Sequence, residues 1–474
     1  MQPLWTVAEV LAATGGRAHE LSEGPLNSVS IDSREIEPAA LFVAIKGETH
    51  DGHDFVGKAI AAGAAAAIVS EEFFAKSGGH RLIIVPDPFE ALRQLAVAAR
   101  ARNKGFVVAV TGSAGKTTTK EAIRTVLSAF GMAHSSVKSF NNHWGVPLTL
   151  ARFPRDAQFG VFEIGMNHAG EITPLVRMVR PHVSVITTVA AAHLEFFESV
   201  AGIAKAKAEI FLGLEPGGTA LLNADHEYVH LLFGYAREAE VARVVTYGYE
   251  QDADWQIGAV AASDGATRTR IRHGIESFDL RLNVPGEHMV ANATAALVVA
   301  RLAGESTSKA LEALHEFAAP EGRGLTLRFG PADTPLVLVD ESYNANIASM
   351  NAALSLYAPV VAPGGTKRLV LGDMLELGPQ GPALAAGLAD PVLATGARQI
   401  VLVGPVMAAL GAALRARIPQ GTPGPEIIEA PTVEQISDKF LAELAYGDAV
   451  MVKGSKGVRL AQLVAAIRTR FEPA

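Results

Sequence analysis

Residues 107–119, with the sequence VVAVTGSAGKTTT, place a glycine-containing turn, a lysine and threonines directly after an apolar segment typical of a buried strand. Gly112 and Gly115 let backbone amides close around phosphate oxygens, and Lys116 adds a positive charge toward the terminal phosphates. Thr117 offers a hydroxyl to Mg²⁺ at the start of a helix. The order strand, loop, helix constrains the fold, because such a loop belongs at the carboxyl end of a strand in a parallel α/β sheet.

The loop is shorter than the common phosphate-binding loop, which has four residues between its glycines. Val110 stands where the first glycine would be and Gly112 replaces it, which gives G-x-x-G-K-T-T. A turn that only caps a helix would need neither Lys116 nor the threonines after it. We expect Lys116 to be exposed in the loop, where its charge is its role. The motif therefore predicts an ATP site formed by Gly112, Ser113, Ala114, Gly115, Lys116, Thr117 and Thr118.

Composition limits the metal chemistry and the partners of the chain. The 474 residues include no cysteine, which excludes disulfides and thiolate-bound zinc and leaves oxygen and imidazole ligands, as around Mg²⁺. Lysine and arginine number 41 against 49 acidic residues, and the net charge of -8 gives no general attraction to nucleic acid or an anionic membrane. The N-terminus lacks a basic region followed by an apolar run. A soluble, cytoplasmic protein is predicted.

The length predicts about three domains at roughly 150 residues each. In residues 1–86, Thr6 is expected to cap a helix, and a small α/β unit is predicted with strands at 41–45, 67–69 and 82–85. The longest apolar stretch, 59–69, is far shorter than the roughly 18 residues of a membrane span, and its alanines predict a buried helix near 57–66. The polar loops 30–34 and 46–53 are either a site or solvated turns, since their composition allows both.

Residues 87–322 alternate strands and helices as a parallel sheet covered on both faces does. Glu163 ends one predicted strand and His193 follows another, so both can converge on a metal beside Thr117, although each alone could be a surface residue. Asn292 precedes a helix predicted at 293–303, where it is either a cap or a binding residue. The strands are expected at 106–110, 160–164, 183–187 and 219–222.

Residues 323–474 repeat strand and helix as a Rossmann-like sheet without a G-x-G-x-x-G loop. Three of the predicted strands end in polar loops, at 340–346, 372–378 and 453–455. Caps and turns explain any one of these loops alone. All three would face the phosphates if this domain closed over the nucleotide domain. The strands are expected at 337–339, 369–371, 400–403 and 449–452.

Seven segments in this order resemble the Mur ligase family over essentially the whole chain: TGSAGKTTTKE, FEIGMNHAGEI, TTVAAAHLEFFESVAGIAKAKAEIF, EGRG, DESYNAN, LGDMLELG and VKGS. The resemblance implies an N-terminal UDP-substrate domain, a central P-loop ATPase domain with a parallel sheet, and a C-terminal Rossmann-like domain. Within the family, YNAN together with GDMLELG indicates a ligase that uses ATP and Mg²⁺ to join D-alanyl-D-alanine to UDP-N-acetylmuramoyl-tripeptide in peptidoglycan synthesis.

The same resemblance implies residue roles. Catalysis and Mg²⁺ binding involve Lys116, Thr117, Glu163, His193 and Lys207. ATP is also bound by Asn292 on the adenine side, Arg323 in the hinge and Asp340 at a strand end. The substrate-binding residues are Ser30, Asp32, Ser33, Arg34, Gly47, His53, Asn141, Asn142, Tyr343, Asn344 and Asn346. Two positions depart from the family, because Glu341 stands where Asp is usual and Ile347 where Pro is usual, which leaves the contact at 341 open.

Lys207 is the anomalous lysine of a helix predicted at 199–214. It follows Ile203 at i+4 in an apolar stripe and is expected to face inward, whereas Lys205 faces solvent and can pair with Glu209. The Lys207 ammonium either reaches a rim of the protein or is buried as a neutral amine that reacts with CO₂. In Mur ligases the matching lysine is carbamylated, and the resemblance implies the same anionic oxygen ligand for a second Mg²⁺ here.

The chemistry implied is phosphorylation of the tripeptide carboxylate by ATP, followed by attack of the dipeptide amine on the acyl phosphate. Two alternatives remain open. One is another Mur-type ligase that adds a diamino acid or glutamates, although the chain lacks an Asp-Asn-Pro-Arg motif. The other is a nucleotide-driven regulatory protein that hydrolyses ATP without a peptide acceptor. No nucleic acid partner and no membrane insertion are expected, and the chain is expected to be a monomer.

Overall fold

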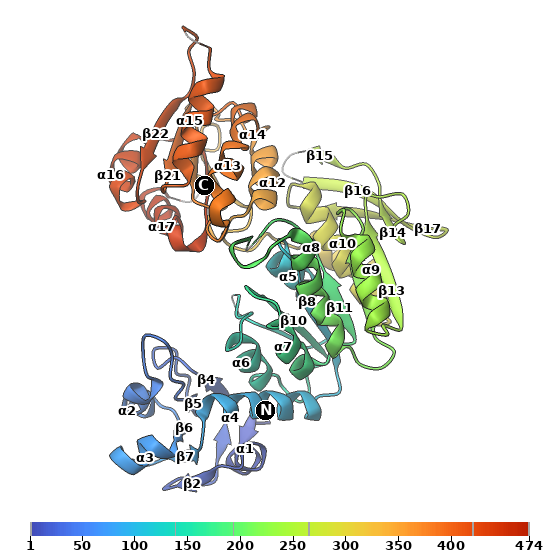
Figure 1. The fold of residues 1–474 in the computed structure, drawn as a ribbon, viewed down its shortest axis with the longest axis vertical. Coiled ribbons are helices and arrows are strands. Elements are labelled where there is room, and N and C mark those ends of the chain that lie inside the picture. The colour runs from blue at the N-terminus through green and yellow to red at the C-terminus, as the bar shows by residue number, and fades with distance from the viewer. Residues whose placement is uncertain (1, 138, 193, 264–265, 420, 473–474) are drawn as a thin grey trace.

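The computed structural model describes residues 2–137, 139–192, 194–263, 266–419 and 421–472. Figure 1 shows three regions along the chain, with the N-terminal region in blue and the C-terminal region in orange and red at opposite ends of the central one. Each region contains a sheet made largely of parallel strands, so the predicted three-domain α/β class is confirmed. Within these residues, no helix has both the length and the apolar character needed to cross a bilayer.

The N-terminal region holds a five-stranded sheet in the order β2-β7-β6-β5-β4. The predicted helix near 57–66 is wrong at its end, because α2 stops at Ala61 and Gly63, with a φ of +109°, turns the chain. The apolar residues that follow form β6 between two parallel neighbours instead. The elements are β1 (Trp5–Thr6), α1 (Val7–Thr14), β2 (Arg17–His19), β3 (Pro25–Leu26), β4 (Ser28–Ser30), β5 (Ala40–Val43), η1 (Gly52–Phe55), α2 (Val56–Ala61), β6 (Ala66–Ser70), α3 (Glu71–Ser77) and β7 (Leu82–Val85).

Helix α4 (Pro88–Arg102) joins the N-terminal and central regions into one apolar core. Its buried side chains Leu92, Leu95 and Ala99 belong to a cluster that contains residues from both regions. The Trp5 indole nitrogen also donates a hydrogen bond to the Ala151 carbonyl at 2.8 Å, across the same junction. The first two regions are therefore packed as a single body around α4.

The central sheet has ten strands, with β8 between β10 and β11 and third from the β9 edge. Helices α5, α10 and α11 cover one face, and α4, α6, α7 and α8 contribute to the core on the other. An antiparallel extension, β14 to β17, was not predicted. The elements are β8 (Phe106–Thr111), α5 (Lys116–Ser128), β9 (Ala133–Ser135), α6 (Gly145–Ala151), β10 (Phe159–Glu163), α7 (Ile172–Val179), β11 (Val183–Ile186), η2 (Leu194–Phe196), α8 (Val200–Ala208), η3 (Glu209–Gly213), β12 (Thr219–Asn223), α9 (Val229–Glu238), β13 (Arg243–Gly248), β14 (Trp255–Ile257), β15 (Ala261–Ser263), β16 (Ala266–His273), β17 (Glu276–Leu282), α10 (Glu287–Leu302) and α11 (Thr307–His315).

The C-terminal sheet has six strands in the order β18-β19-β23-β20-β21-β22, with β18 antiparallel to β19. Because β19, β23 and β20 are neighbours, the three polar loops predicted from the sequence lie side by side at their carboxyl ends. The elements are β18 (Leu325–Phe329), β19 (Leu336–Glu341), α12 (Ile347–Tyr357), β20 (Lys367–Gly372), η4 (Gly378–Gln380), α13 (Gly381–Ala386), α14 (Ala389–Ala394), β21 (Gln399–Val403), α15 (Met407–Arg417), β22 (Glu426–Ala430), α16 (Glu434–Glu443), β23 (Ala449–Lys453), η5 (Lys456–Val458) and α17 (Ala461–Arg470).

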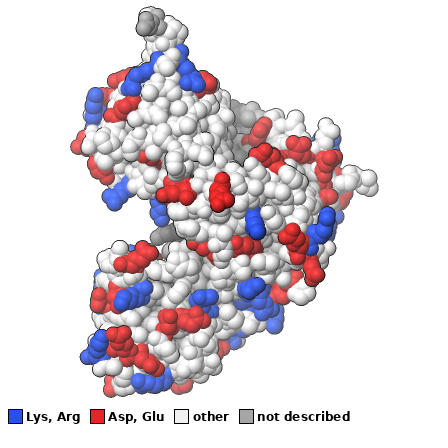
Figure 2. All heavy atoms as spheres, viewed as in Figure 1, with Lys and Arg blue, Asp and Glu red and all other residues white. Residues whose placement is uncertain are grey.

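The face of the molecule in Figure 2 is hollowed between the N-terminal and C-terminal regions. On this face, acidic and basic side chains are interspersed over all three regions. Among the described residues, this face therefore carries no large patch of a single charge sign.

Candidate active site

The loop between β8 and α5 lies at the carboxyl end of a central strand and requires both of its glycines. Gly112 has a φ of +154°, and a Cβ there would collide with the Thr187 hydroxyl. Gly115 has a φ of +81°, and its Cβ would lie 2.9 Å from the side-chain oxygen of Asn292. The first amides of α5 have no partner within the helix and point toward this loop, as an anion site requires.

The loop is held in shape by the segment that follows β11. The Ser113 amide donates to the Thr188 carbonyl at 2.8 Å, and the Ser113 hydroxyl donates to the Ala190 carbonyl at 2.9 Å. The Thr187 hydroxyl donates to the Ala114 carbonyl at 2.5 Å. Two neighbouring strand ends therefore fix the loop conformation, which is preorganisation of the kind that anion binding needs.

Lys116 is the first residue of α5 and is not exposed in a loop, so that part of the prediction is wrong. Its Nζ folds back over the loop and donates to the Gly112 carbonyl at 2.7 Å. Burial lowers the pKa of Lys116, and the nearby Arg323 lowers it further, whereas Glu163 raises it. The Lys116 side chain therefore crosses the loop within the site and does not extend into solvent.

Thr117 and Glu163 form the buried centre of the site. The Thr117 hydroxyl donates to one Glu163 carboxylate oxygen at 2.7 Å, and Asn141 donates its side-chain amide to the other at 2.6 Å. The hydroxyls of Thr117 and Ser139 are 3.1 Å apart. Ser139 was missed, because its loop meets α5 only through the tertiary fold. The next threonine, Thr118, is also buried.

Lys207 lies on α8 with only 2% of its surface exposed, so it faces inward as predicted. Burial and the nearby charge of Lys116 hold the pKa of Lys207 well below its ordinary value. Lys205 is exposed as expected, but Glu209 accepts hydrogen bonds from Gly170 and Thr173 and forms no ion pair with Lys205 in the described part of the chain. His193, the other predicted ligand, lies outside the described residues.

Asn292 lies within α10 rather than ahead of it, since the helix begins at Glu287 and not at residue 293. The prediction that Asn292 could cap the helix is therefore wrong. Its side-chain oxygen accepts a hydrogen bond from the Thr119 hydroxyl at 2.9 Å and borders Gly115. This places Asn292 against the phosphate loop at Gly115.

Arg323 and Asp340 have different surroundings at the start of the C-terminal region. Arg323 stacks on the Tyr343 ring at 4.1 Å and donates to the Ser139 hydroxyl at 3.3 Å. Ser139 in turn contacts Thr117, so a single residue links Arg323 to Thr117. Asp340 accepts hydrogen bonds from the Gly322 amide at 3.0 Å and the Ser342 hydroxyl at 2.6 Å. Asp340 therefore orders the hinge, with its carboxylate engaged by its own loop.

Lys453 ties together two of the three C-terminal loops, those at 340–346 and 453–455. Its Nζ donates to the Glu341 carboxylate at 3.0 Å and to the Asn344 carbonyl at 3.1 Å. The contact at position 341, left open by the sequence, is thus an ion pair within the domain. Asn346 caps α12 with its side-chain oxygen and donates its side-chain nitrogen to the Ser113 carbonyl at 3.0 Å. One loop therefore touches the phosphate loop directly.

The predicted N-terminal substrate residues form a compact turn after β4. The Ser30 hydroxyl accepts from the Asp32 amide at 3.1 Å, and Ser33 is buried. Arg34 pairs with Asp32 at 2.6 Å, and this bond holds the pKa of Asp32 at about 2. The Arg34 side chain is otherwise exposed, so the turn presents a charged pair at the surface.

Three other predicted substrate residues have roles in the local fold. A Cβ at Gly47 would lie 2.9 Å from the Trp144 ring. His53 donates from Nδ1 to Asp51 at 2.6 Å and accepts the Ser70 amide at Nε2, which leaves neither ring nitrogen free. Asn142 accepts the Gly145 amide at the start of α6. These residues shape the loops that carry them.

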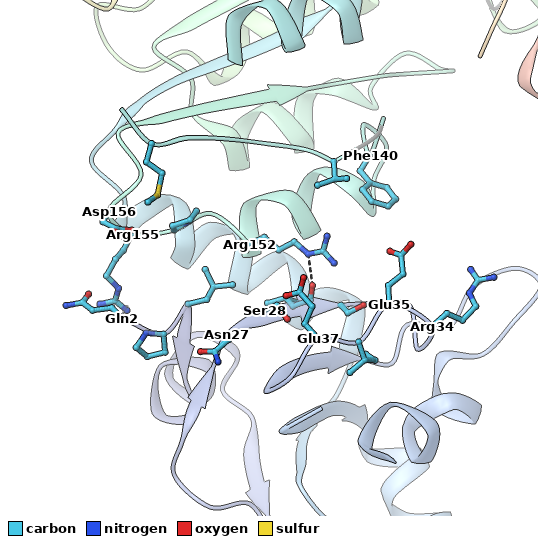
Figure 3. A pocket seen from close by; sticks show the side chains of 18 residues that line it. Gln2, Asn27, Ser28, Arg34, Glu35, Glu37, Phe140, Arg152, Arg155 and Asp156 are labelled. Atoms are coloured by element: carbon cyan, nitrogen blue, oxygen red, sulfur yellow. Dashed lines mark hydrogen bonds between the residues drawn. The ribbon is translucent and has the colours of Figure 1, made fainter. Parts of the chain in front are cut away.

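A cavity of about 1060 Å³ lies between the N-terminal and central regions. Ser30 and Arg34 line it, and Figure 3 shows Arg152 of the central region facing Glu35 and Glu37. The Arg152 Nε donates to the carbonyl of Val29 at 2.6 Å. Sequence reasoning missed Arg152, because nothing in its local pattern marks it as a cavity residue.

Comparison with known proteins identifies the family. Models described as "Mur ligase family, catalytic domain", "Mur ligase middle domain" and "Mur ligase, glutamate ligase domain" match residues 25–100, 110–300 and 328–456. A UDP-N-acetylmuramoyl-tripeptide--D-alanyl-D-alanine ligase from Escherichia coli (strain K12) is 36% identical over 391 residues, which cover 80% of this chain and 81% of the relative. The chain belongs to the Mur ligase family.

Other Mur ligases match its whole length. A ligase of the same name from Mycobacterium tuberculosis is 30% identical over 98% of this chain and 97% of its own. A crystal structure of MurF from Acinetobacter baumannii superposes with a TM-score of 0.83 at 28% identity and covers 98% of each chain. The predicted boundary at 86/87 falls within the first matched range, and both domain boundaries, 86/87 and 322/323, stay a prediction.

Proposed function

We propose that this chain is the ATP-dependent ligase that adds D-alanyl-D-alanine to UDP-N-acetylmuramoyl-tripeptide and releases ADP and phosphate. The product is the pentapeptide precursor of peptidoglycan. The observation that carries this proposal is the hydrogen bond from Asn346 to Ser113. It brings the YNAN loop, the segment most specific for dipeptide addition, against the phosphate loop. Full-length relatives that carry this activity in their names support the same assignment.

The donors beside the phosphate loop fit a magnesium ion. Thr117 and Glu163 are buried oxygen donors 2.7 Å apart at a helix N-terminus, and Mg²⁺ binds through one or two such groups together with phosphates and water. We propose that these two residues hold Mg²⁺ together with His193 and Lys207. When bound there, the ion neutralises charge on the ATP phosphates.

In the first step, an oxygen of the tripeptide carboxylate attacks the γ-phosphorus of ATP, the bond to the ADP oxygen breaks, and an acyl phosphate forms. Lys116 and the first amides of α5 bind the β and γ phosphates and stabilise their charge. Arg323, held beside Thr117 through Ser139, supplies a second cation. These groups let two anions approach closely.

In the second step, the amine of D-alanyl-D-alanine attacks the acyl carbon. The tetrahedral intermediate expels phosphate, and the amine loses a proton. Water must be kept away, because it would hydrolyse the acyl phosphate. We propose that Tyr343, Asn344 and Asn346 bind the dipeptide and cover this step, since their loop borders the phosphate loop.

Lys207 has the properties of a carbamylated residue. Burial lowers the pKa of this amine and so favours its neutral form, and a neutral amine adds to CO₂ with loss of a proton to give a carbamate. The carbamate places an anionic oxygen donor at the metal side of the site. We propose this modification as part of the active enzyme.

In the N-terminal region, we propose that the cavity beside Ser30, Asp32, Ser33 and Arg34 receives part of the UDP-linked substrate. ATP and a UDP-linked peptide as substrates favour a cytoplasmic enzyme. We also propose a monomer, which size-exclusion chromatography with light scattering tests.

The deciding experiment measures ADP release with UDP-N-acetylmuramoyl-tripeptide, with and without D-alanyl-D-alanine. ADP formation is expected to require both compounds, and the product is expected to gain the mass of two alanine residues. Equal ATP turnover without the dipeptide would contradict the proposal and favour a nucleotide-driven regulatory protein. Turnover with a single amino acid in place of the dipeptide would indicate another Mur-type ligase.

A further inference from the structure

Lys120 is a fully buried lysine that none of the steps above uses. It lies one turn after Thr117 on α5, and none of its side chain is exposed. Its Nζ donates to the Ser136 carbonyl at 2.8 Å and pairs with a Glu121 carboxylate oxygen at 2.7 Å. Burying a charge is costly unless it is paired and hydrogen-bonded, and here the partner backbone belongs to the loop that follows β9.

The described residues of that loop, 136–137 and 139–142, supply two contacts to the centre of the site. Ser139 lies 3.1 Å from the Thr117 hydroxyl and accepts from Arg323 at 3.3 Å. Asn141 donates to Glu163 at 2.6 Å. The loop is also tied to the strand end, since the Gly165 amide donates to the Asn141 carbonyl. The loop thus contacts both proposed metal ligands, Thr117 through Ser139 and Glu163 through Asn141.

Lys120 and Thr117 lie at i and i+3 on the same helix, so they face the same side of α5. Thr117 contacts the loop at Ser139, and Lys120 contacts it at Ser136. These two contacts fix both the position and the angle of the loop relative to α5. Removing Lys120 would remove the contact at Ser136 and keep the one at Ser139.

We propose that Lys120 is a positioning residue that anchors the described part of this loop at Ser136, so that Ser139 and Asn141 hold Thr117 and Glu163 in the geometry that binds Mg²⁺ with the nucleotide. This role rests on the proposed function only in its use of a magnesium nucleotide. It differs from a purely structural role, because it predicts a weaker response to Mg²⁺ at an unchanged metal-free affinity for ADP, which a loss of stability alone would not produce.

The test is nucleotide binding by Lys120→Met, measured by calorimetry with ADP as the probe. ADP affinity in EDTA is expected to stay within about twofold of the unmodified protein, since the loop amides and Lys116 are unchanged. The Mg²⁺ concentration that gives half of the metal-dependent gain in ADP affinity is expected to rise roughly 10- to 100-fold, as for other residues that orient metal ligands. An unchanged Mg²⁺ midpoint in the folded variant would overturn the proposal.

The matched control is Arg124→Ala, which removes the other partner of Glu121 at the surface and leaves Lys120 in place. Its Mg²⁺ midpoint is expected to match that of the unmodified protein, and an equal shift in this control would overturn the specific role of Lys120. If Lys120→Met does not fold, Glu121→Gln, which keeps the lysine and removes its ionic partner, is titrated instead. A rise in the midpoint supports the proposal, and no change contradicts it.

A double-mutant cycle with Ser139→Ala tests the route of the effect. The two shifts in Mg²⁺ midpoint are expected to be non-additive, because both substitutions act through the same loop, and additive shifts would overturn the proposal. Dipeptide-dependent ADP formation by the unmodified protein is measured separately. Absence of dipeptide-dependent ADP formation in the unmodified protein would contradict the proposed function. Ligase activity in the unmodified protein together with an unshifted Mg²⁺ midpoint in Lys120→Met would contradict only the role of Lys120.

Discussion

At the scale of single residues, the charged groups of the site are oriented by neutral neighbours. Lys116 is directed by the Gly112 carbonyl, and Glu163 by Thr117 and Asn141. Because these hydrogen bonds already hold the charged groups in place, the binding of a phosphate requires little reorganisation of the site. The site therefore depends on the identity of small polar side chains as much as on its charges.

Lys116→Ala is expected to abolish ligation and leave the fold intact. The lost charge should cost at least about 3 kcal/mol of transition-state stabilisation, which is more than a hundredfold in kcat/KM. ADP release measures the activity, and thermal unfolding checks the fold. Lys205→Ala, at an exposed position on α8, is the control and should keep full activity. Near-normal turnover by Lys116→Ala would contradict the assignment.

Lys207→Ala is expected to be nearly inactive and to regain part of its activity with added acetate or formate. A small carboxylate can occupy the space of the carbamate and supply its oxygen donor. Removing bicarbonate and CO₂ should lower the activity of the unmodified protein. Full activity of Lys207→Ala in CO₂-free buffer would rule out the carbamate.

The residues that the sequence predicted best are contiguous with a strand end. Gly112 to Thr118 follow β8 in one run, and Glu163 closes β10, so their meeting follows from a parallel sheet alone. Ser139 and Arg152 could not be found in this way, because each lies in or beside a loop whose position depends on packing far away in sequence.

At the scale of elements, the short strand β9 carries a histidine that makes the central region sensitive to acid. His134 stacks on Phe153 and hydrogen-bonds the Thr149 carbonyl at 2.8 Å. Burial lowers the pKa of His134 from 6.5 to about 4. The unfolded chain therefore binds more protons than the folded one between these values, and stability falls as the pH drops from 6.5 to 4.

His134→Gln is expected to reduce this loss of stability by up to about 3 kcal/mol, since glutamine keeps a donor for Thr149 but does not titrate. Urea unfolding at pH 7 and at pH 4.5 measures the difference. His226, whose pKa burial also lowers to about 4, should leave a residual acid sensitivity in the variant. Identical pH dependence in both proteins would show that His134 does not carry the effect.

Elements with a clear local pattern were predicted within a residue or two, and β7 matched its predicted range of 82–85. The start of α10 was not, because Glu287 to Asn292 follow Gly286 with polar residues that also suit a turn. The extension β14 to β17 was missed although β16 alternates buried and exposed residues, which is the signal of a half-buried strand.

At the scale of the whole molecule, several contacts among the described residues join the C-terminal region to the central one, and three of the hydrogen bonds lie at the site. Asn346 reaches Ser113, Arg323 reaches Ser139, and the Glu195 amide donates to the Glu376 carbonyl at 3.1 Å. All three lie near the phosphate loop or the segment after β11. These hydrogen bonds therefore hold the C-terminal region against the site.

Asn346→Ser is expected to uncouple ATP use from ligation. Serine still caps α12 but is too short to reach the Ser113 carbonyl. More acyl phosphate should be lost to water, so the ratio of ADP to ligated product should rise above the value near one expected for the unmodified protein. Mass spectrometry of the product together with ADP release measures this ratio. A ratio that stays near one in a folded variant would argue against the contact as a seal.

The shared core around α4 also determines which parts of this chain can be exchanged. The described residues of the C-terminal region form two apolar clusters of their own, and the chain enters that region through one short link around Gly322. Residues 1–86 instead depend on α4 and α6 for part of their interior. Recombination between relatives can therefore replace the last third as a separate module. A foreign N-terminal segment would instead lack matching partners for the apolar side chains that it packs against α4 and α6.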